Sequence, residues 1–261
     1  MVTRREAAVA GTFYPADAGK LAAMVDGSLA GAQGNGSLPK AVIAPHAGYI
    51  YSGPIAASAY SYLANGKDTI RRVILMGPAH RVPLRGLAAS SAQIFTTPLG
   101  DVPVDQKALA KVLDLPQVRI WDEAHAFEHS LEIHLPFLQR LYPQFSIVPI
   151  LVGQANAEDV AEVLEKLWGG PETAVVISSD LSHFHDYNTA QQLDQATAQA
   201  ITALNGEALE YESACGRNAI RGLLKVAKEK GLNGRLVDLR NSGDTSGSRS
   251  RVVGYGAFIF E

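Results

Sequence analysis

Short apolar runs alternate with longer amphipathic segments along most of the chain. Short runs rich in Val and Ile and bounded by Pro, Gly or Ser are typical of buried strands, whereas apolar residues recurring three or four positions apart are typical of helices. The predicted strands are 40–44, 72–76, 86–90, 145–152, 173–177, 234–239 and 252–260. The predicted helices are 19–30, 54–63, 105–113, 130–142, 157–167 and 188–204, followed by two more within 208–230.

This alternation predicts an α/β fold of three layers (α/β/α), with helices on both faces of a central sheet. Helices separate most strands, which favours parallel pairing, but segment 252–260 follows a loop rich in Ser and Gly. We therefore expect a mixed, mostly parallel sheet. The chain of 261 residues has no repeat at solenoid spacing and no long linker, so we expect residues 1–261 to form a single domain.

A histidine follows each of three predicted strands. Pro45 ends the first strand because proline cannot donate to a sheet ladder, and His46 comes directly after it. His80 and His183 follow the second and fifth predicted strands in the same way. The carboxyl ends of parallel strands meet at one edge, where α/β sheets build ligand sites. One such histidine is usually structural, but three predict a convergent site, and imidazole is a common ligand of iron, copper and zinc.

Two other side chains near these strands can carry chemistry. Asp180 lies shortly before His183, and a carboxylate beside an imidazole suits general acid–base catalysis. Cys215 stands at the predicted start of a helix and close to Arg217, and both features favour the thiolate that binds metals. The alternative for Cys215 is a small buried apolar residue.

A second cluster of polar residues contains His125, His129, Glu132 and His134. Its acid is misplaced for the His-Glu-x-x-His motif, so the spacing excludes a zinc-protease site. We expect His129 and Glu132 to contact the substrate or the metal ligands, with a polar start of a helix as the alternative.

Further candidates lie near the first histidine and in the late loop. Phe13, Tyr49 and Tyr51 are candidate aromatic walls of a substrate cleft, although packing in the core is the more common fate of such residues. Asp244 could face the same site, with a solvated turn as the alternative.

Composition narrows the classes of function. The formal net charge of −3 gives no broad attraction to nucleic acid or to acidic membranes. The one cysteine excludes an intrachain disulfide, which fits a reducing compartment. The first residues lead into an Ala/Val stretch too short for a signal peptide, and no run approaches the roughly 20 apolar residues of a membrane helix. We therefore expect a cytoplasmic location and neither a membrane nor a nucleic-acid partner.

Seven short stretches occur in a characteristic order and spacing. They are Gly11-Thr12-Phe13-Tyr14-Pro15, Ala44-Pro45-His46-Ala47-Gly48-Tyr49, Gly77-Pro78-Ala79-His80, Glu128-His129-Ser130-Leu131-Glu132, Ser178-Ser179-Asp180-Leu181-Ser182-His183, Cys215-Gly216-Arg217 and Ser250-Arg251-Val252-Val253-Gly254-Tyr255. With these stretches, nearly the whole chain resembles the Memo family.

This resemblance implies a domain similar to the catalytic subunits of class III extradiol ring-cleaving dioxygenases. It also implies His46, His80 and Cys215 as metal ligands, with His183 as the catalytic base and Asp180 beside it. The dioxygenases use a carboxylate as their third ligand. The cysteine departs from that pattern, because a thiolate is softer, suits copper(I), zinc or iron, and is itself oxidisable.

Three functions stay open at this point. The first is a mononuclear non-haem Fe(II) oxidoreductase of the extradiol dioxygenase type, which acts on a catechol-type or other small phenolic substrate with oxygen. The second is a redox protein that binds copper or iron, or zinc in their place, without organic turnover. The third is a non-catalytic module that holds a peptide or small ligand in the same cleft. For bacterial and archaeal relatives, the resemblance implies a radical-SAM protein and an AMMECR1-type protein as partners.

Overall fold

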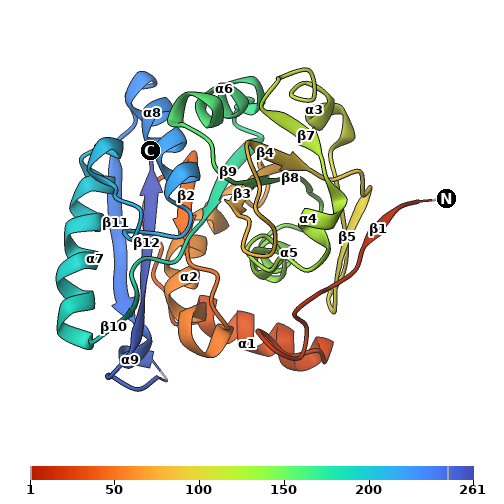
Figure 1. The fold of residues 1–261 in the computed structure, drawn as a ribbon. Helices are drawn as coiled ribbons and strands as arrows, with labels where there is room; N and C mark the ends of the chain where they lie inside the picture. The colour runs from red at the N-terminus through yellow and green to blue at the C-terminus, as the bar shows by residue number, and fades with distance from the viewer. Residues whose placement is uncertain (1, 246) are drawn as a thin grey trace.

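The computed structural model describes residues 2–245 and 247–261. Within them, a mixed sheet of nine strands runs through the centre of the molecule (Figure 1). Its strands are β2 (Ala41–Ala44), β3 (Arg72–Pro78), β4 (Leu87–Ala89), β7 (Val118–Ile120), β8 (Ser146–Val152), β9 (Thr173–Ser178), β10 (His183–His185), β11 (Gly234–Asn241) and β12 (Val252–Phe260). The mixed sheet expected from the sequence is confirmed.

Strands β2, β9, β3 and β8 lie side by side in that order and run parallel. β12 pairs with β2 in the antiparallel direction, and β11 forms an antiparallel pair with β12. β4 runs antiparallel to β8 at the other end of the sheet. The four parallel strands therefore deliver their carboxyl ends to one edge, with β9 between β2 and β3.

Helices cover both faces of this sheet, as Figure 1 shows. One layer contains α1 (Ala18–Ala30), α2 (Tyr49–Leu63) and α5 (Leu135–Leu141), and the other contains α6 (Ala157–Leu167), α7 (Tyr187–Thr202) and α8 (Arg217–Glu229). The central strands are buried on both sides, which explains why β2 and β9 consist of apolar and small residues throughout. The predicted three-layer α/β architecture is confirmed.

The remaining elements are short. Strands β1 (Arg4–Arg5), β5 (Ile94–Thr97) and β6 (Gly100–Pro103) form a small sheet of their own. The short helices are α3 (Gln106–Ala110), α4 (Asp122–Ala126) and α9 (Ser242–Thr245), and 3-10 turns occur at Ala64–Gly66, Glu132–His134 and Gly206–Ala208.

Two predicted helix starts are wrong. α2 begins at Tyr49 rather than at Pro54, because the Tyr49 N–H donates to the Phe13 carbonyl (2.8 Å) and fixes the first turn earlier. α5 begins at Leu135, because the hydroxyl of Ser130 donates to the Pro78 carbonyl (2.8 Å) instead of capping a helix. Segment 208–230 contains one helix, α8, instead of two.

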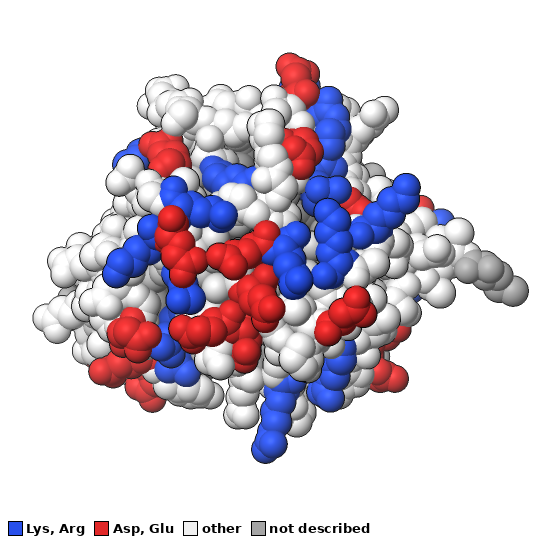
Figure 2. Space-filling model, turned by 90° about the horizontal axis from the view of Figure 1, so that it is seen from above, with Lys and Arg blue, Asp and Glu red and all other residues white. Residues whose placement is uncertain are grey.

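The surface carries both signs of charge. Figure 2 shows acidic side chains gathered near the middle of one face, with Lys and Arg side chains around them and in a column to their right. Among residues 2–245 and 247–261, no helix has the length and apolar character needed to cross a membrane.

Candidate metal centre

His46 and His80 come together at the carboxyl edge of the sheet. His46 follows β2 and His80 follows β3, and the centroids of their rings lie 5.2 Å apart. Cys215, just before the start of α8, approaches from the helical layer, and its Sγ lies 3.4 Å from Nε2 of His46. One ligand atom from each of these three residues lies within 4.8 Å of the other two.

Ser178 at the end of β9 determines which nitrogen of His46 carries its proton. Nδ1 of the buried His46 lies 2.5 Å from the hydroxyl oxygen of Ser178, which itself donates to the Ser130 carbonyl at 2.6 Å. A hydroxyl has one proton, so Nδ1–H of His46 is the donor to Ser178 and Nε2 keeps its lone pair. Burial, and then the neighbouring His80 and His129, hold the pKa of His46 well below its usual value. The imidazole is therefore a neutral ligand with Nε2 free.

Glu128 likewise determines which nitrogen of His80 carries the proton. Its Oε1 lies 2.9 Å from Nδ1 of His80, and its carboxylate also accepts the backbone N–H groups of His80, His129 and Ser130. Burial alone would raise the pKa of Glu128, but the hydrogen bonds from His129 and His80 outweigh it and hold the pKa well below its usual range. An ionised carboxylate on Nδ1 fixes the ring and leaves Nε2 as the free donor atom.

Cys215 is half-buried, and the exposed part of its surface opens into a cavity. Burial, and then the negative charge of Asp180, raise the pKa of its thiol well above the usual value. The expectation that the helix start and Arg217 lower this pKa is therefore wrong for the metal-free chain. Arg217 is directed to the ring of Tyr211, with 5.4 Å between guanidinium and ring centroid. A bound cation would reverse the effect, because coordination deprotonates a thiol.

A third imidazole packs against the first two. The ring of His129 is stacked on His80 at 4.8 Å and lies edge-on to His46 at 5.4 Å. Phe13 contacts the same ring, with 4.6 Å between centroids. His129 and Phe13, both expected near the site, therefore line its inner side.

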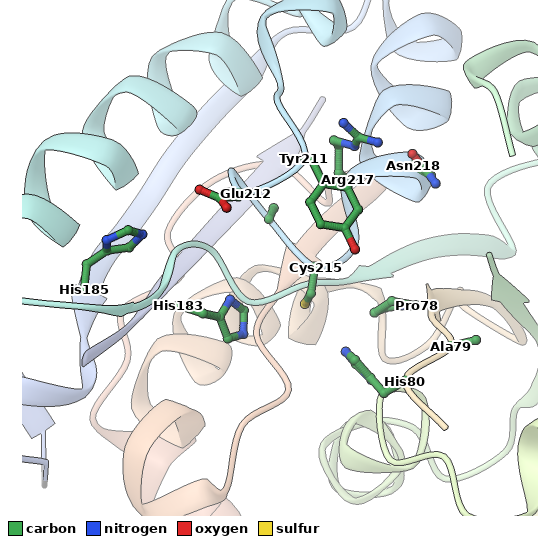
Figure 3. Close-up of a pocket in the computed structure, with 11 residues that line it drawn as sticks. Pro78, Ala79, His80, His183, His185, Tyr211, Glu212, Cys215, Arg217 and Asn218 are labelled. Carbon is green, nitrogen blue, oxygen red and sulfur yellow. The ribbon is translucent and has the colours of Figure 1, made fainter. Parts of the chain in front are cut away.

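His183 lies on the wall of a cavity of about 500 Å³ that His80 and Cys215 also line. Figure 3 shows the side chains of His80, His183 and Cys215 directed towards a common space. Asp180 is buried, which raises the pKa of its carboxyl, and it accepts the backbone N–H of His46 at 2.8 Å. In the described part of the chain no hydrogen bond joins Asp180 to His183, so Asp180 holds the His46 loop instead of orienting His183.

The sequence and the fold of the chain resemble those of known proteins. A family model described as "Memo-like protein" matches residues 5–259. A MEMO1 family protein of Ignicoccus hospitalis is 37% identical and one of Aquifex aeolicus is 36% identical, each over 98% of this chain and 98% of the relative. The chain belongs to the Memo family. Its fold also resembles the crystal structure of an uncharacterized protein from Escherichia coli K12, with a TM-score of 0.54, 14% identity, and coverage of 84% of this chain and 98% of that one.

Four further residues that the sequence placed near the site make contacts with other parts of this Memo-family chain. Glu132 is fully buried and binds the side chains of Arg5 and Tyr14. The hydroxyl of Tyr49 donates to the Ile133 carbonyl at 2.6 Å, and Tyr51 packs on the core. Asp244, within α9, accepts from the hydroxyl of Tyr187 and from the backbone N–H of Asn241.

Glu128 and Ser178, the two partners that orient the histidines, were not predicted from the sequence. Both lie inside stretches that resemble the Memo family, and Glu128 is next to His129. The useful signal was a carboxylate or hydroxyl beside a predicted ligand, because metal-binding histidines nearly always donate their second nitrogen to such a group.

Proposed function

We propose that this Memo-family protein binds one transition-metal ion through His46, His80 and Cys215. In this proposal it acts as a mononuclear non-haem Fe(II) oxidoreductase on a small aromatic substrate of the catechol type. The main support is that buried partners occupy Nδ1 of both histidines. This leaves both Nε2 atoms as donors, and one ligand atom from each of His46, His80 and Cys215 lies within 4.8 Å of the other two.

The donor set fits a first-row transition metal. Metal–nitrogen and metal–sulfur distances of about 2.1 and 2.3 Å place neighbouring ligand atoms roughly 3.5 Å apart, and Sγ of Cys215 lies 3.4 Å from Nε2 of His46. Two imidazoles and one anionic ligand match in number the facial triad of non-haem iron oxygenases, which leaves positions for substrate and oxygen. Bound iron(II) supplies electron transfer to oxygen and Lewis-acid binding of a phenolate.

The surrounding residues of the chain supply binding and proton transfer. His183 lines the cavity beside the ligands and is partly exposed, so it can accept the proton of a phenol as the substrate enters. His129 and Phe13 close the inner side with their rings. Asp180 fixes the backbone of His46 and so keeps that ligand in place.

Cys215 supports a second candidate, a copper-binding redox protein without organic turnover. A thiolate is a soft ligand that favours copper(I) over the hard metals, and it replaces the carboxylate of the ring-cleaving enzymes. The two candidates share the site and differ in the metal bound and in turnover.

Metal content is the first test of the site. We expect anaerobically purified wild-type protein to carry nearly one equivalent of iron and a His46→Ala/His80→Ala double variant to carry none. His125→Gln is the matched control, because His125 is buried away from the ligands and donates to the Ala88 carbonyl at 3.0 Å. Stoichiometric copper instead of iron would favour the second candidate. No metal in the wild type, even after reconstitution, would refute both.

Oxygen uptake with a panel of phenols tests the reaction. The iron-loaded wild type should consume oxygen with at least one catechol. His183→Gln should keep its metal and lose about 100-fold or more of that rate, which is the usual contribution of a general acid–base. A metal-loaded wild type that consumes no oxygen with any catechol would end the ring-cleavage proposal while leaving metal binding intact.

A further inference from the structure

The wall of the cavity contains an arginine that has no acidic partner among the described residues. Arg217 lines the cavity and is half-buried. Among the ion pairs of the described residues, none involves Arg217, whereas Arg221 one turn further along α8 binds Glu207 at 2.9 Å. A half-buried guanidinium at the wall of a ligand cavity, with its donors free, is arranged to bind an anion.

Among the described residues, one carboxylate lines this cavity, and it does not neutralise Arg217. Glu212 is exposed, and Figure 3 shows its carboxylate on the side of His185, whereas the guanidinium of Arg217 lies on the far side of Tyr211. Within the described residues of α8, the first turn holds no acidic residue and no side chain caps the N-terminus. The partial positive charge of that helix end therefore adds to the charge of Arg217.

Tyr211 supplies an aromatic surface beside this charge. It is 82% exposed, which is unusual for a large aromatic side chain, and it lines the cavity between Cys215 and the guanidinium of Arg217 (Figure 3). An aromatic ring of a ligand in the cavity would cover part of the Tyr211 side chain. Aromatic side chains in binding sites are commonly covered by a ligand in this way.

We propose that Arg217 and Tyr211 form a subsite for a carboxylate group of the substrate, which selects acidic over neutral phenols. The inference rests on the proposed function, because the phenolic end of the same molecule would lie at His46, His80 and Cys215. In the view of Figure 3 the ring of Tyr211 lies between Cys215 and the guanidinium of Arg217, so the acid group and the phenolic end would bind at different places on the cavity wall.

The test compares two probes that differ only in the acid group, 3-(3,4-dihydroxyphenyl)propanoate and its neutral amide, by calorimetric titration of metal-loaded and metal-free protein. We expect the wild type to bind the acid about tenfold or more tightly than the amide, as one charge-assisted hydrogen-bonded pair provides. Arg217→Gln should remove this preference and leave the affinity for the amide unchanged. Arg217→Lys should keep part of the preference for the acid, because the positive charge remains. It should not keep all of it, because the planar guanidinium that binds a carboxylate through two hydrogen bonds is lost.

Arg221→Gln is the matched control, because it removes the same charge from the same helix outside the cavity. Equal affinity of the wild type for acid and amide would overturn the proposal. If Arg217→Gln and Arg221→Gln lost the preference for the acid to the same extent, the proposal would also be overturned, because the preference would then reflect the overall charge of the protein. These outcomes are separable from failure of the metal centre, because metal content is measured independently and the comparison of acid with amide is also made on metal-free protein.

Discussion

At the scale of single residues, one hydroxyl proton determines which nitrogen of His46 can bind an ion. Ser178 gives its proton to the Ser130 carbonyl and must therefore accept from Nδ1 of His46. Without that acceptor, nothing fixes the ring or its tautomer, and Nε2 carries the proton for part of the time. The ligand state of His46 thus depends on a residue that binds no metal itself.

We accordingly predict that Ser178→Ala weakens metal affinity by about 10- to 100-fold, the usual loss when the partner of a metal-binding histidine is removed. Competition titration with a chromophoric chelator measures this. Ser130→Ala is the control, because it also removes a buried hydroxyl but keeps the carbonyl that accepts from Ser178. Equal losses in the two variants would mean that general loosening of the site, and not the tautomer of His46, causes the effect.

The sequence predicted the metal-binding candidates more fully than their partners. Strand ends placed His46 and His80 at one edge of the sheet, because residues next to a regular element inherit its position. Glu128 was not predicted, since the segment before α5 has no regular period, and its place depends on backbone N–H donors of His80, His129 and Ser130. Such contacts between distant segments leave no periodic trace in a sequence.

At the scale of elements, the approach of α8 to β9 positions the thiol of Cys215. Gly216 stands where the two elements meet, and a Cβ there would lie 2.5 Å from the Ser178 carbonyl oxygen and 2.7 Å from Cβ of Ser179. Its backbone is in an ordinary region, with φ at −89°, so glycine is needed for space and not for conformation. Residue 216, next to Cys215, is therefore glycine because the start of α8 packs closely against the end of β9.

Gly216→Ala should displace the start of α8, lower the free energy of unfolding by about 1–3 kcal/mol through overpacking, and weaken metal binding through Cys215. Thermal melting and metal titration measure the two effects. Gly27→Ala is the control, because nothing lies within 4 Å of a Cβ at that exposed position in α1. It should raise stability by about 0.5–1 kcal/mol, since alanine favours the helix interior. A Gly216→Ala variant as stable as wild type would contradict the packing argument.

The elements predicted best were those with a strong period or a long apolar run. The predicted helix 157–167 coincides with α6, and the strands β3, β8 and β9 agree within one or two residues. The elements that were missed are short: they include β5, β6, β7, β10, α4 and α9, which contain three to five residues each and depend on neighbouring segments. β10 even contains Phe184 at a φ of 64°, a backbone conformation that local preference disfavours.

At the scale of the whole molecule, buried neutral histidines link folding to pH. Burial is the main cause that lowers the pKa of His125 to about 4 and that of His134 to about 3, from an ordinary value of 6.5. Neither residue belongs to the proposed ligand set. His125 donates to the Ala88 carbonyl, and His134 is hydrogen-bonded to the Tyr60 hydroxyl at 2.8 Å. In the unfolded chain both regain their ordinary pKa and take up protons below pH 6.5.

The unfolded state therefore binds more protons than the native state once the pH falls below 6.5, so the free energy of unfolding decreases with falling pH. Each histidine contributes a slope of up to about 1.4 kcal/mol per pH unit. Glu128 adds to the loss only near and below its ordinary pKa of 4.5, because its folded pKa is lowered. Urea unfolding of metal-free protein at pH 7, 6 and 5 should show the decrease. A His125→Gln/His134→Gln double variant should show a shallower one, and parallel curves for the two proteins would assign the acid sensitivity to other groups.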